Sequence, residues 1–382
     1  MSMRERRMQD LRRTVPQLDP VAARERLDQG ALLLDVREPD EIAQGTPLGA
    51  QPLSRGFLEL RIERLAPDLD QPIILLCESG ARSLFAAASL QQLGYRQVYN
   101  VSGGFQRWKA EGLPCAVPRS LNAEARQRYA RQLNLPEVGE QGQQRLQDSR
   151  VLIVGAGGLG SPAALYLAAA GVGTLGIVDH DRVDRSNLQR QILHADSRVG
   201  MSKANSAEVA LKALNPSVEV CTHELRVDAT NADALVHDYD LVLDGSDNFR
   251  TRYVLNDACL RHGLPLVHGS IYRFEGQVAA FWPQREGPCY RCLFPEPPPP
   301  ELAPSCDEAG VLGVLPGTIG LLQATEALKL LLDIGEPLLG RMVIYNALSS
   351  EMRRLRIAAR MGCSCRTRSV EPIEALQGDA AL

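Results

Sequence analysis

A glycine-rich loop between an apolar run and a helical pattern restricts the fold of this chain more than any other feature. The apolar run 151–154 leads into Gly155-Ala-Gly157-Gly158-Leu-Gly160, and a helical pattern and a second apolar run, 174–178, follow. This order is the repeating unit of a parallel sheet, and the glycine spacing is that of a phosphate-binding turn. We therefore predict a nucleotide-binding, doubly wound α/β sheet here. The alternative is a glycine turn that serves only helix–sheet packing.

The apolar runs 241–243 and 266–269 extend the predicted sheet, and the alternating segment 276–282 predicts an antiparallel extension. A smaller α/β domain precedes it, because the runs 31–36, 73–77 and 98–101 alternate with helical patterns. We expect the following domain boundaries: an N-terminal tail, residues 1–16; the small domain, 17–117; the nucleotide-binding domain, 118–370; and a C-terminal tail, 371–382.

Composition excludes several classes of protein. The 382 residues carry a net charge of −4 and only 5% aromatic residues, so we expect no nucleic-acid partner. The uncharged stretches 151–178 and 309–325 are interpreted as buried α/β core, and no membrane partner is expected. Nine cysteines spread along the chain, and a charged N-terminus without an apolar stretch, favour the cytoplasm.

A cysteine follows one of the predicted strands of the small domain. The segment Cys77-Glu-Ser-Gly80-Ala-Arg82-Ser83 connects that strand to a helical pattern. Backbone N–H groups and a helix N-terminus at such a turn lower a thiol pKa and bind an anion. Arg82 can hold the loop or a negative sulfur atom. The chemistry indicated is sulfur transfer through a persulfide, and the alternative is a buried structural cysteine.

Acidic and basic residues follow the glycine loop in the second domain. Asp179 ends the next predicted strand and can accept hydrogen bonds from ribose hydroxyls. Arg190 and Lys203 can neutralise a triphosphate, and Asp247, beside Asn248, can hold Mg²⁺. This set favours ATP over a nicotinamide dinucleotide, although any one of the two cations could be an ordinary surface charge. Cys289 and Cys292 have the spacing of half a zinc site.

The first domain resembles the single-domain rhodaneses. The resemblance rests on the Cys77 loop, on Asp35-Val-Arg-Glu38 and on Gly103-Gly-Phe-x-x-Trp108. It implies that Cys77 carries a persulfide. Residues 45–50 depart from the usual family pattern. Because Glu78 places a negative charge beside the nucleophile, we expect a protein-bound persulfide donor, such as a cysteine desulfurase, rather than thiosulfate.

The second domain, over residues 122–366, resembles the MoeB/ThiF adenylyltransferases, which are relatives of the ubiquitin-activating enzymes. The resemblance is closest to the molybdopterin-synthase adenylyltransferases. It implies a Rossmann-like sheet, binding of ATP and Mg²⁺, and adenylation of the C-terminal Gly-Gly of a ubiquitin-like sulfur carrier. It also implies a homodimer in which Arg131 reaches the nucleotide of the other subunit. The matching segments are 128–132, 154–160, Asp179-x-Asp181, the run Ser186-Asn187-Leu188-Gln189-Arg190, Asp247-Asn248 and 289–292.

The same resemblance completes the cysteine assignments. It supplies Cys363 and Cys365 as the second half of a structural Zn²⁺ site, at a Cys-x-Cys spacing one residue shorter than usual. Cys306 matches a family position that in some members links covalently to the carrier. Together the two domains imply carrier adenylation followed by sulfur transfer from Cys77. The alternatives are a thiazole or tRNA-thiolation carrier, a dinucleotide-dependent oxidoreductase and a non-catalytic scaffold.

Overall fold

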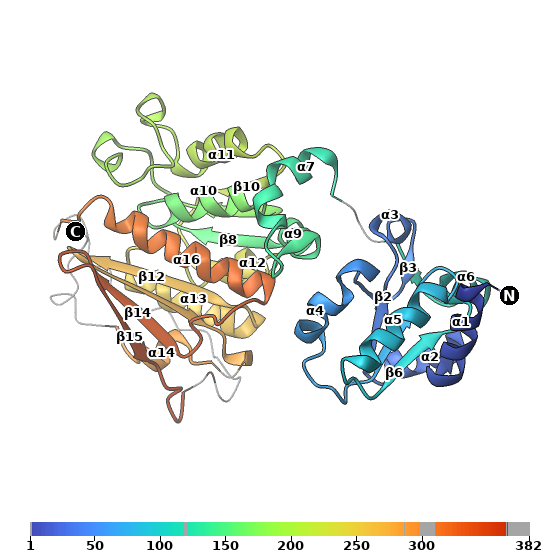
Figure 1. Ribbon diagram of the computed structural model, residues 1–382. Coiled ribbons are helices and arrows are strands. Elements are labelled where there is room, and N and C mark those ends of the chain that lie inside the picture. Colours follow the sequence, from blue (N-terminus) through green and yellow to red (C-terminus); the bar gives the residue numbers. More distant parts are fainter. Residues whose placement is uncertain (1, 118–120, 286, 298–309, 364, 366–382) are drawn as a thin grey trace. The chain divides into compact units, whose positions relative to one another are not determined.

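The computed structural model describes residues 2–117, 121–285, 287–297, 310–363 and 365. The chain divides into two compact units, Met1–Ser120 and Leu121–Leu382, each with its own sheet and apolar clusters (Figure 1). Among the described residues, no helix combines the length and the apolar character that crossing a bilayer requires.

A parallel sheet in the order β1-β6-β5-β2-β4 forms the first unit, and β3 and β7 form a separate antiparallel pair. The strands are β1 Gln17–Leu18, β2 Leu32–Asp35, β3 Thr46–Pro47, β4 Gln51–Pro52, β5 Ile73–Leu76, β6 Val98–Val101 and β7 Cys115–Ala116. The helices are α1 Met3–Thr14, α2 Pro20–Asp28, α3 Pro39–Ile42, the 3-10 turn η1 Arg55–Phe57, α4 Leu58–Leu65, α5 Ala81–Gln92 and α6 Gly104–Ala110.

The central strand β5 is buried on both faces. Ile73 and Leu75 belong to the cluster under α1, α4 and α5, whereas Ile74 and Leu76 belong to the cluster under α2 and α6. Successive strand residues point to opposite faces, so an uninterrupted apolar run is what a sheet covered on both sides requires. This confirms the α/β class predicted for the first unit.

The segment 1–16, set apart above as a tail, differs from that expectation. It contains helix α1, which starts with a capping box between Ser2 and Glu5. Leu11 and Val15 are buried in the cluster that also holds residues of α5. The segment is mostly polar, so its few packed apolar residues leave only a weak pattern in the sequence.

The second unit contains an eight-stranded sheet in the order β10-β9-β8-β11-β12-β13-β14-β15. The first five strands in this order are parallel and the last three are antiparallel, as the sequence predicts for 276–282. The strands are β8 Arg150–Val154, β9 Thr174–Val178, β10 Glu219–His223, β11 Leu241–Asp244, β12 Leu266–Tyr272, β13 Glu275–Phe281, β14 Arg341–Asn346 and β15 Glu351–Arg356.

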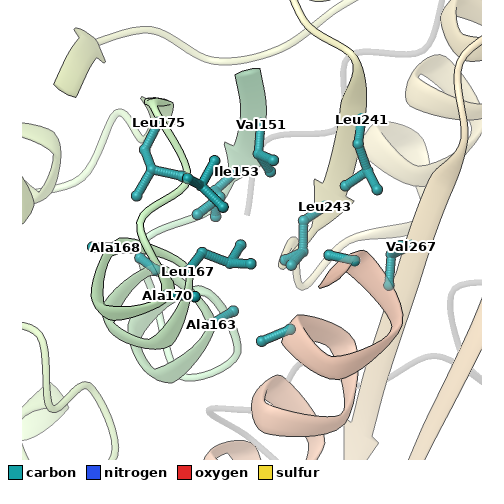
Figure 2. Close-up of a cluster of buried hydrophobic side chains, with 14 of the residues drawn as sticks. Val151, Ile153, Ala163, Leu167, Ala168, Ala170, Leu175, Leu241, Leu243 and Val267 are labelled. Atoms are coloured by element: carbon teal, nitrogen blue, oxygen red, sulfur yellow. The ribbon is translucent and has the colours of Figure 1, made fainter. Parts of the chain in front are cut away.

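Helices cover both faces of this sheet. They are α7 Ala123–Arg128, α8 Ala130–Leu133, α9 Gly139–Asp148, α10 Gly160–Ala170, α11 Lys203–Leu214, α12 Ala232–Val236, α13 Phe249–His262, α14 Tyr290–Leu293 and α16 Leu315–Leu332, with the 3-10 turns η2 Arg185–Asn187, η3 Asp196–Arg198 and η4 Pro283–Arg285. Figure 2 shows Val151 and Ile153 of β8 and Leu243 of β11 pointing toward Leu167 of α10. Leu152 faces the opposite cluster, with residues of α12 and α13.

The strand order indicates at which edge of the sheet a binding site can form. From β8 the chain runs outward through β9 and β10, and it returns to the other side of β8 as β11. The carboxyl ends of parallel strands on either side of such a switch point leave a crevice. The glycine loop, Asp179 and Asp247 all follow strands that end at this crevice.

Candidate active site

A cavity of about 560 Å³ lies at the carboxyl ends of the parallel strands in the second unit. Residues that follow β8, β9, β10 and β11 line it, together with residues from the segment 187–203. Four strand ends and one connecting segment therefore form one polar space. Its lining is far richer in charged side chains than the apolar sheet beneath it.

The glycine loop forms one wall of the cavity. Gly155 has a φ of +93°, and a Cβ at this position would lie 2.7 Å from the Gly245 carbonyl oxygen. A Cβ on Gly160 would lie 1.8 Å from the Gly155 carbonyl oxygen. A Cβ on Gly157 would meet only the Gln191 side chain, at 3.6 Å. Gly155 and Gly160 are therefore needed for packing, whereas Gly157 keeps the backbone open toward the cavity.

Asp179 is held rigidly at the end of β9. Its Oδ2 accepts from the Ala156 N–H at 2.8 Å and its Oδ1 from the Asp181 N–H at 2.8 Å. Burial raises the pKa of Asp179, against the lowering effect of Lys203 and these two hydrogen bonds. The carboxylate joins the glycine loop to β9, and each of its oxygen atoms retains a lone pair for a ligand hydroxyl.

Lys203 begins α11 and is almost completely buried. Its Nζ donates to Asp181 Oδ2 at 2.8 Å. Burial alone would raise the pKa of Asp181, but the hydrogen bond and the charge of Lys203 outweigh it and lower that pKa. Asp181 is half exposed, so it holds the ammonium group at the cavity wall without removing its charge from the site. Arg190 lines the same cavity.

The loop after β11 carries Asp247 and Asn248. Both side chains are exposed and line the cavity, and Asn248 Oδ1 caps α13 by accepting from the Thr251 N–H at 2.9 Å. The first turn of α13 adds Arg250 and Arg252 to the lining. The Asp247 carboxylate accepts one long hydrogen bond, from Asn248 Nδ2 at 3.4 Å, and an exposed carboxylate of this kind is a suitable ligand for Mg²⁺ on a polyphosphate.

Two buried polar atoms of the lining have no hydrogen-bond partner among the residues that the structure describes. They are Gln191 Oε1 and Arg252 Nε, on side chains that are 5% and 8% exposed. Buried polar groups are normally paired, because an unpaired one costs free energy. Both side chains belong to the cavity lining, although these two atoms are themselves inaccessible to solvent.

Nine of the predicted nucleotide-binding residues line the cavity, and four do not. Those in the lining are Gly155, Gly157, Gly158, Asp179, Asn187, Arg190, Lys203, Asp247 and Asn248. Those outside it are Gly160, Ser186, Leu188 and Gln189. Gly160 packs against the glycine loop, and Gln189 lies where a Cβ on Gly313 would be. Arg131 is exposed on α8 and does not contribute to the lining. Cys306 lies outside the described residues.

Several titratable lining residues were not predicted from the sequence. They are His180, Arg226, Asp228, Arg250 and Arg252. Arg226 and Asp228 follow β10, and recognising the run 219–223 as a strand would have placed them at the same sheet edge. Arg250 and Arg252 belong to the first turn of the helix that Asn248 caps.

His194 connects the glycine loop to helix α11. Its Nε2 lies 2.9 Å from the Ala156 carbonyl oxygen and its Nδ1 lies 2.9 Å from the Ser206 hydroxyl. A carbonyl only accepts, so Nε2 carries the proton and Nδ1 accepts from Ser206. Burial lowers the pKa of His194 to about 4, and the charges of Lys203 and Arg198 also lower it. The neutral ring thus joins the loop to α11.

In the first unit, Cys77 lies at the end of β5, buried in a tight loop. The Ser83 hydroxyl donates to its Sγ at 3.3 Å. The Phe105 and Gln106 N–H groups bond the carbonyls of Cys77 and Glu78 at 2.8 and 3.1 Å. Within the described chain, none of the N–H groups of residues 78–82 donates a hydrogen bond. These N–H groups remain available for an anion or a sulfur atom bound at Cys77.

Two ion pairs hold this loop. Arg82 makes a bidentate pair with Glu41, at 2.5 and 2.6 Å. The hydrogen bond from Arg82 lowers the pKa of Glu41 to about 2, although burial opposes it. Glu78 pairs with the buried Arg37 at 3.1 Å. Arg82 therefore holds the loop, one of the two roles predicted for it, and Glu78 is tied to the scaffold beside Cys77.

Four cysteines from distant parts of the second unit converge. The Sγ atoms of Cys289, Cys292, Cys363 and Cys365 all lie within 4.8 Å of one another. Cys289 lies 3.5 Å from Cys363, and Cys292 lies 3.5 Å from Cys365, too far for disulfide bonds. Four sulfur atoms at about 2.3 Å from one zinc ion would be about 3.8 Å apart, so the cluster fits a tetrahedral zinc site.

The fold and the cavity define a doubly wound α/β protein with a polar site at the strand ends, joined to a small α/β unit with a cradled cysteine. The chain belongs to the ThiF family, whose pattern matches residues 129–367. Residues 19–111 match the rhodanese-like domain. Both family resemblances drawn from the motifs are thereby confirmed.

Similar proteins have names that refer to adenylyl and sulfur transfer. The chain is 53% identical over 248 residues to the probable adenylyltransferase/sulfurtransferase MoeZ of Mycobacterium tuberculosis, covering 64% of this chain and 63% of that protein. It is 53% identical over 256 residues to the SAMP-activating enzyme E1 of Haloferax volcanii, covering 67% of this chain and 94% of that protein. The chain thus spans less than two thirds of the length of MoeZ.

Solved structures show the same fold at lower identity. The chain superposes on the crystal structure of E. coli MccB with ATP with a TM-score of 0.55, at 21% identity, covering 64% of this chain and 76% of that one. It superposes on PaaA with the same TM-score, at 23% identity, covering 63% and 76% of the two chains.

Proposed function

We propose that this protein uses ATP to adenylate the C-terminal glycine of a ubiquitin-like sulfur carrier and then transfers sulfur to it from a persulfide on Cys77. The observation that carries the proposal is the convergence of Arg190, Lys203 and Asp247 on one cavity beside the glycine loop. The names of the relatives at about 50% identity support both halves of the reaction. The sulfur-transfer domain is residues 17–117 and the adenylyl domain is residues 118–370.

The cavity suits the charge problem of adenylation. A carboxylate that attacks the α-phosphate of ATP meets strong like-charge repulsion, and pyrophosphate leaves with further negative charge. Arg190 and Lys203 offset this charge and need no covalent intermediate on the enzyme. Asp247 would hold Mg²⁺, which would neutralise charge on the phosphates. Asp179 would accept from the ribose hydroxyls, and Arg131 would act on the nucleotide of a second subunit in a homodimer.

The sulfur step balances with one external reductant. The terminal sulfur of the Cys77 persulfide attacks the acyl carbon, a carbon–sulfur bond forms and AMP leaves. The product is an acyl disulfide between the carrier and Cys77. A thiol reductant then breaks the sulfur–sulfur bond, which leaves a carrier thiocarboxylate and a free Cys77 thiol. The loop N–H groups would stabilise negative charge on the sulfur. Cys306 is retained as a candidate for contact with the activated carrier.

The persulfide donor is proposed to be a protein, such as a cysteine desulfurase. Glu78 is fixed beside Cys77 by Arg37, and the guanidinium group of Arg82 is occupied by Glu41. Both arginines near Cys77, Arg37 and Arg82, are therefore already paired with carboxylates and would attract a thiosulfate dianion only weakly. A persulfide on a partner protein carries less negative charge than thiosulfate. The four-cysteine cluster is proposed to hold a structural Zn²⁺ ion. We place the protein in the cytoplasm.

The carrier is proposed to be the small subunit of molybdopterin synthase. A thiazole or tRNA-thiolation carrier would use the same chemistry. An oxidoreductase that uses a nicotinamide dinucleotide would not need a cation set and a metal-binding carboxylate at the phosphates. A scaffold without catalysis would not need the paired, buried Lys203.

The test is ATP–pyrophosphate exchange by the purified full-length protein with each carrier in turn. Carrier-dependent exchange supports adenylation, and the carrier that gives it identifies the pathway. Exchange with none of them, and no binding of ATP by calorimetry, would overturn the proposal.

A further inference from the structure

The metal-binding turn, residues 289–292, is attached to helix α13 at three points. The Tyr290 N–H donates to Asn256 Oδ1 at 2.8 Å. Arg291 makes a bidentate pair with Asp257, at 2.7 and 2.8 Å. Just beyond the turn, the Phe294 carbonyl accepts from the Tyr253 hydroxyl at 2.9 Å. Asn256 and Asp257 are almost completely buried, so the turn is locked to one side of α13.

The same helix begins at the nucleotide cavity. Asn248 caps it, and its first turn supplies Arg250, Thr251 and Arg252 to the cavity lining. The helix runs from Phe249 to His262 without interruption, so its first turn and its attachment to the metal-binding turn move together. A shift at one end of a packed helix is transmitted to the other, because protein interiors have no room to absorb it.

A second connection runs through the Tyr290 ring. The ring lies 5.0 Å from that of His268, whose Nδ1 is 2.8 Å from Asp244 Oδ2. The other oxygen of Asp244 is bonded by the Ser246 N–H and hydroxyl, at 3.0 and 2.5 Å. Ser246 itself lines the cavity. All four side chains are buried, so this path is as rigid as α13.

Cys363 and Cys365 lie after β15, in a segment that also reaches the metal-binding turn through a hydrogen bond from the Arg360 N–H to Cys292 Sγ at 3.4 Å. The sulfur atoms form two close pairs between the turn and this segment, Cys289 with Cys363 and Cys292 with Cys365. A metal ion with tetrahedral coordination would be bound by all four. Occupancy of the site would therefore add a link between the turn and the segment after β15, and the turn is bonded to the helix whose first turn lines the cavity.

We propose that Arg291 and Tyr290 are positioning residues that couple the four-cysteine site to the nucleotide cavity, so that bound metal strengthens ATP binding and bound ATP retards metal loss. The inference rests on the proposed function for the identity of the nucleotide. Coupling of two binding equilibria is reciprocal, so metal must strengthen ATP binding by the same factor as ATP strengthens metal binding.

The experiment measures zinc release from the full-length, zinc-loaded protein to a chromogenic chelator, with and without saturating ATP. In the wild type, ATP is expected to slow release by about fivefold or more. The variant Arg291→Met with Asp257→Asn removes the ion pair without leaving a buried unpaired charge. ATP is expected to slow release less in this variant than in the wild type, and some slowing should remain because the contacts of Tyr290 with Asn256 and His268 are kept. A purely structural pair would change both rates by one factor and leave their ratio intact.

The matched control is Arg261→Met with Asp233→Asn. This pair lies at the other end of α13 and is also bidentate, at 2.9 and 2.9 Å, but it does not touch the metal-binding turn. It is expected to keep the wild-type ratio. A wild-type ratio in the Arg291 variant would overturn the positioning role.

Calorimetry separates this inference from the proposed function. If ATP binds the wild type and zinc release does not change, the coupling is wrong and the function stands. If ATP does not bind, both are wrong. Should the double variant fail to fold, the ATP dissociation constants of zinc-loaded and zinc-free wild type decide the question, because equal constants exclude the coupling.

Discussion

The loops after β5 and β8 have the same local design and end in different kinds of site. Each connects a buried parallel strand to a helix through glycine, an arrangement that suits anion binding by backbone N–H groups. The β5 loop closes around one buried thiol, because α6 packs against its carbonyls. The β8 loop opens onto a cavity of about 560 Å³, because three other strand ends stop at the same edge. The number of converging segments, rather than the loop itself, sets what each site can hold.

The largest expected effects separate the two sites completely. Asp247→Ala should lower ATP–pyrophosphate exchange by about a hundredfold or more, because charge on the phosphates loses its metal ligand. The loading of Cys77 with sulfur should remain intact. Cys77→Ala should abolish thiocarboxylate formation and leave exchange unchanged. Exchange assays and mass spectrometry of the carrier measure these effects, and a loss of exchange in Cys77→Ala would mean that the sites are not independent.

Substitution by alanine at two glycines of the β8 loop should affect different properties, stability in one case and ATP binding in the other. Gly160→Ala should cost more than about 3 kcal/mol of unfolding free energy, because its Cβ would overlap the Gly155 carbonyl oxygen. Gly157→Ala should change stability by less than about 0.5 kcal/mol but weaken ATP binding about tenfold, since its methyl group would enter the cavity. Urea unfolding and calorimetry test the pair. Equal stability losses would show that Gly157 also serves packing.

Acid should unfold the second unit before the first. The pKa of His194 falls from 6.5 to about 4 on folding, so the unfolded chain binds its proton first and stability decreases as the pH falls from 6.5 toward 4. The loss from this residue is about 3 kcal/mol. Glu41 contributes in a lower window, because its pKa falls from 4.5 to about 2 and its pairing with Arg82 is lost only there.

The two tryptophans report the units separately, since Trp108 lies in the first and Trp282 in the second. Fluorescence of Trp108→Phe and Trp282→Phe variants should give two acid transitions, with that of Trp282 at the higher pH. His194→Gln, which does not titrate, should move only that transition to lower pH. A Trp108 transition at higher pH than the Trp282 transition would contradict the prediction that the second unit unfolds first.

The smallest expected effect concerns the sulfur donor. Glu78→Gln should raise the thiosulfate:cyanide transfer rate about tenfold, because it removes one negative charge beside Cys77. The exposed Glu63 on α4 provides the control, and Glu63→Gln should leave the rate unchanged. A high thiosulfate:cyanide transfer rate in the wild type, or an unchanged rate in Glu78→Gln, would show that Glu78 does not select against thiosulfate.

Much of the fold was predictable because strands and turns leave local signals. The apolar runs 73–77 and 151–154 supplied the buried strands β5 and β8. Helix α1 was missed because a polar surface helix held mainly by Leu11 leaves almost no apolar pattern. The helices α7 and α8 meet at Tyr129, whose hydroxyl accepts from Asn215 Nδ2 at 2.8 Å, a contact that no local pattern indicates.

The sequence by itself determined the candidate residues at each loop: Cys77, Asp179, Lys203 and Asp247 were all selected from their neighbours in the chain. Only the tertiary structure decided which side chains meet. The pairing of Lys203 with Asp181, the arrival of Arg226 and Arg252 at the cavity, and the approach of Cys363 to Cys289 depend on strand order and helix packing. Turn chemistry and apolar periodicity act over a few residues, whereas these contacts join segments whose distance is set by the whole sheet.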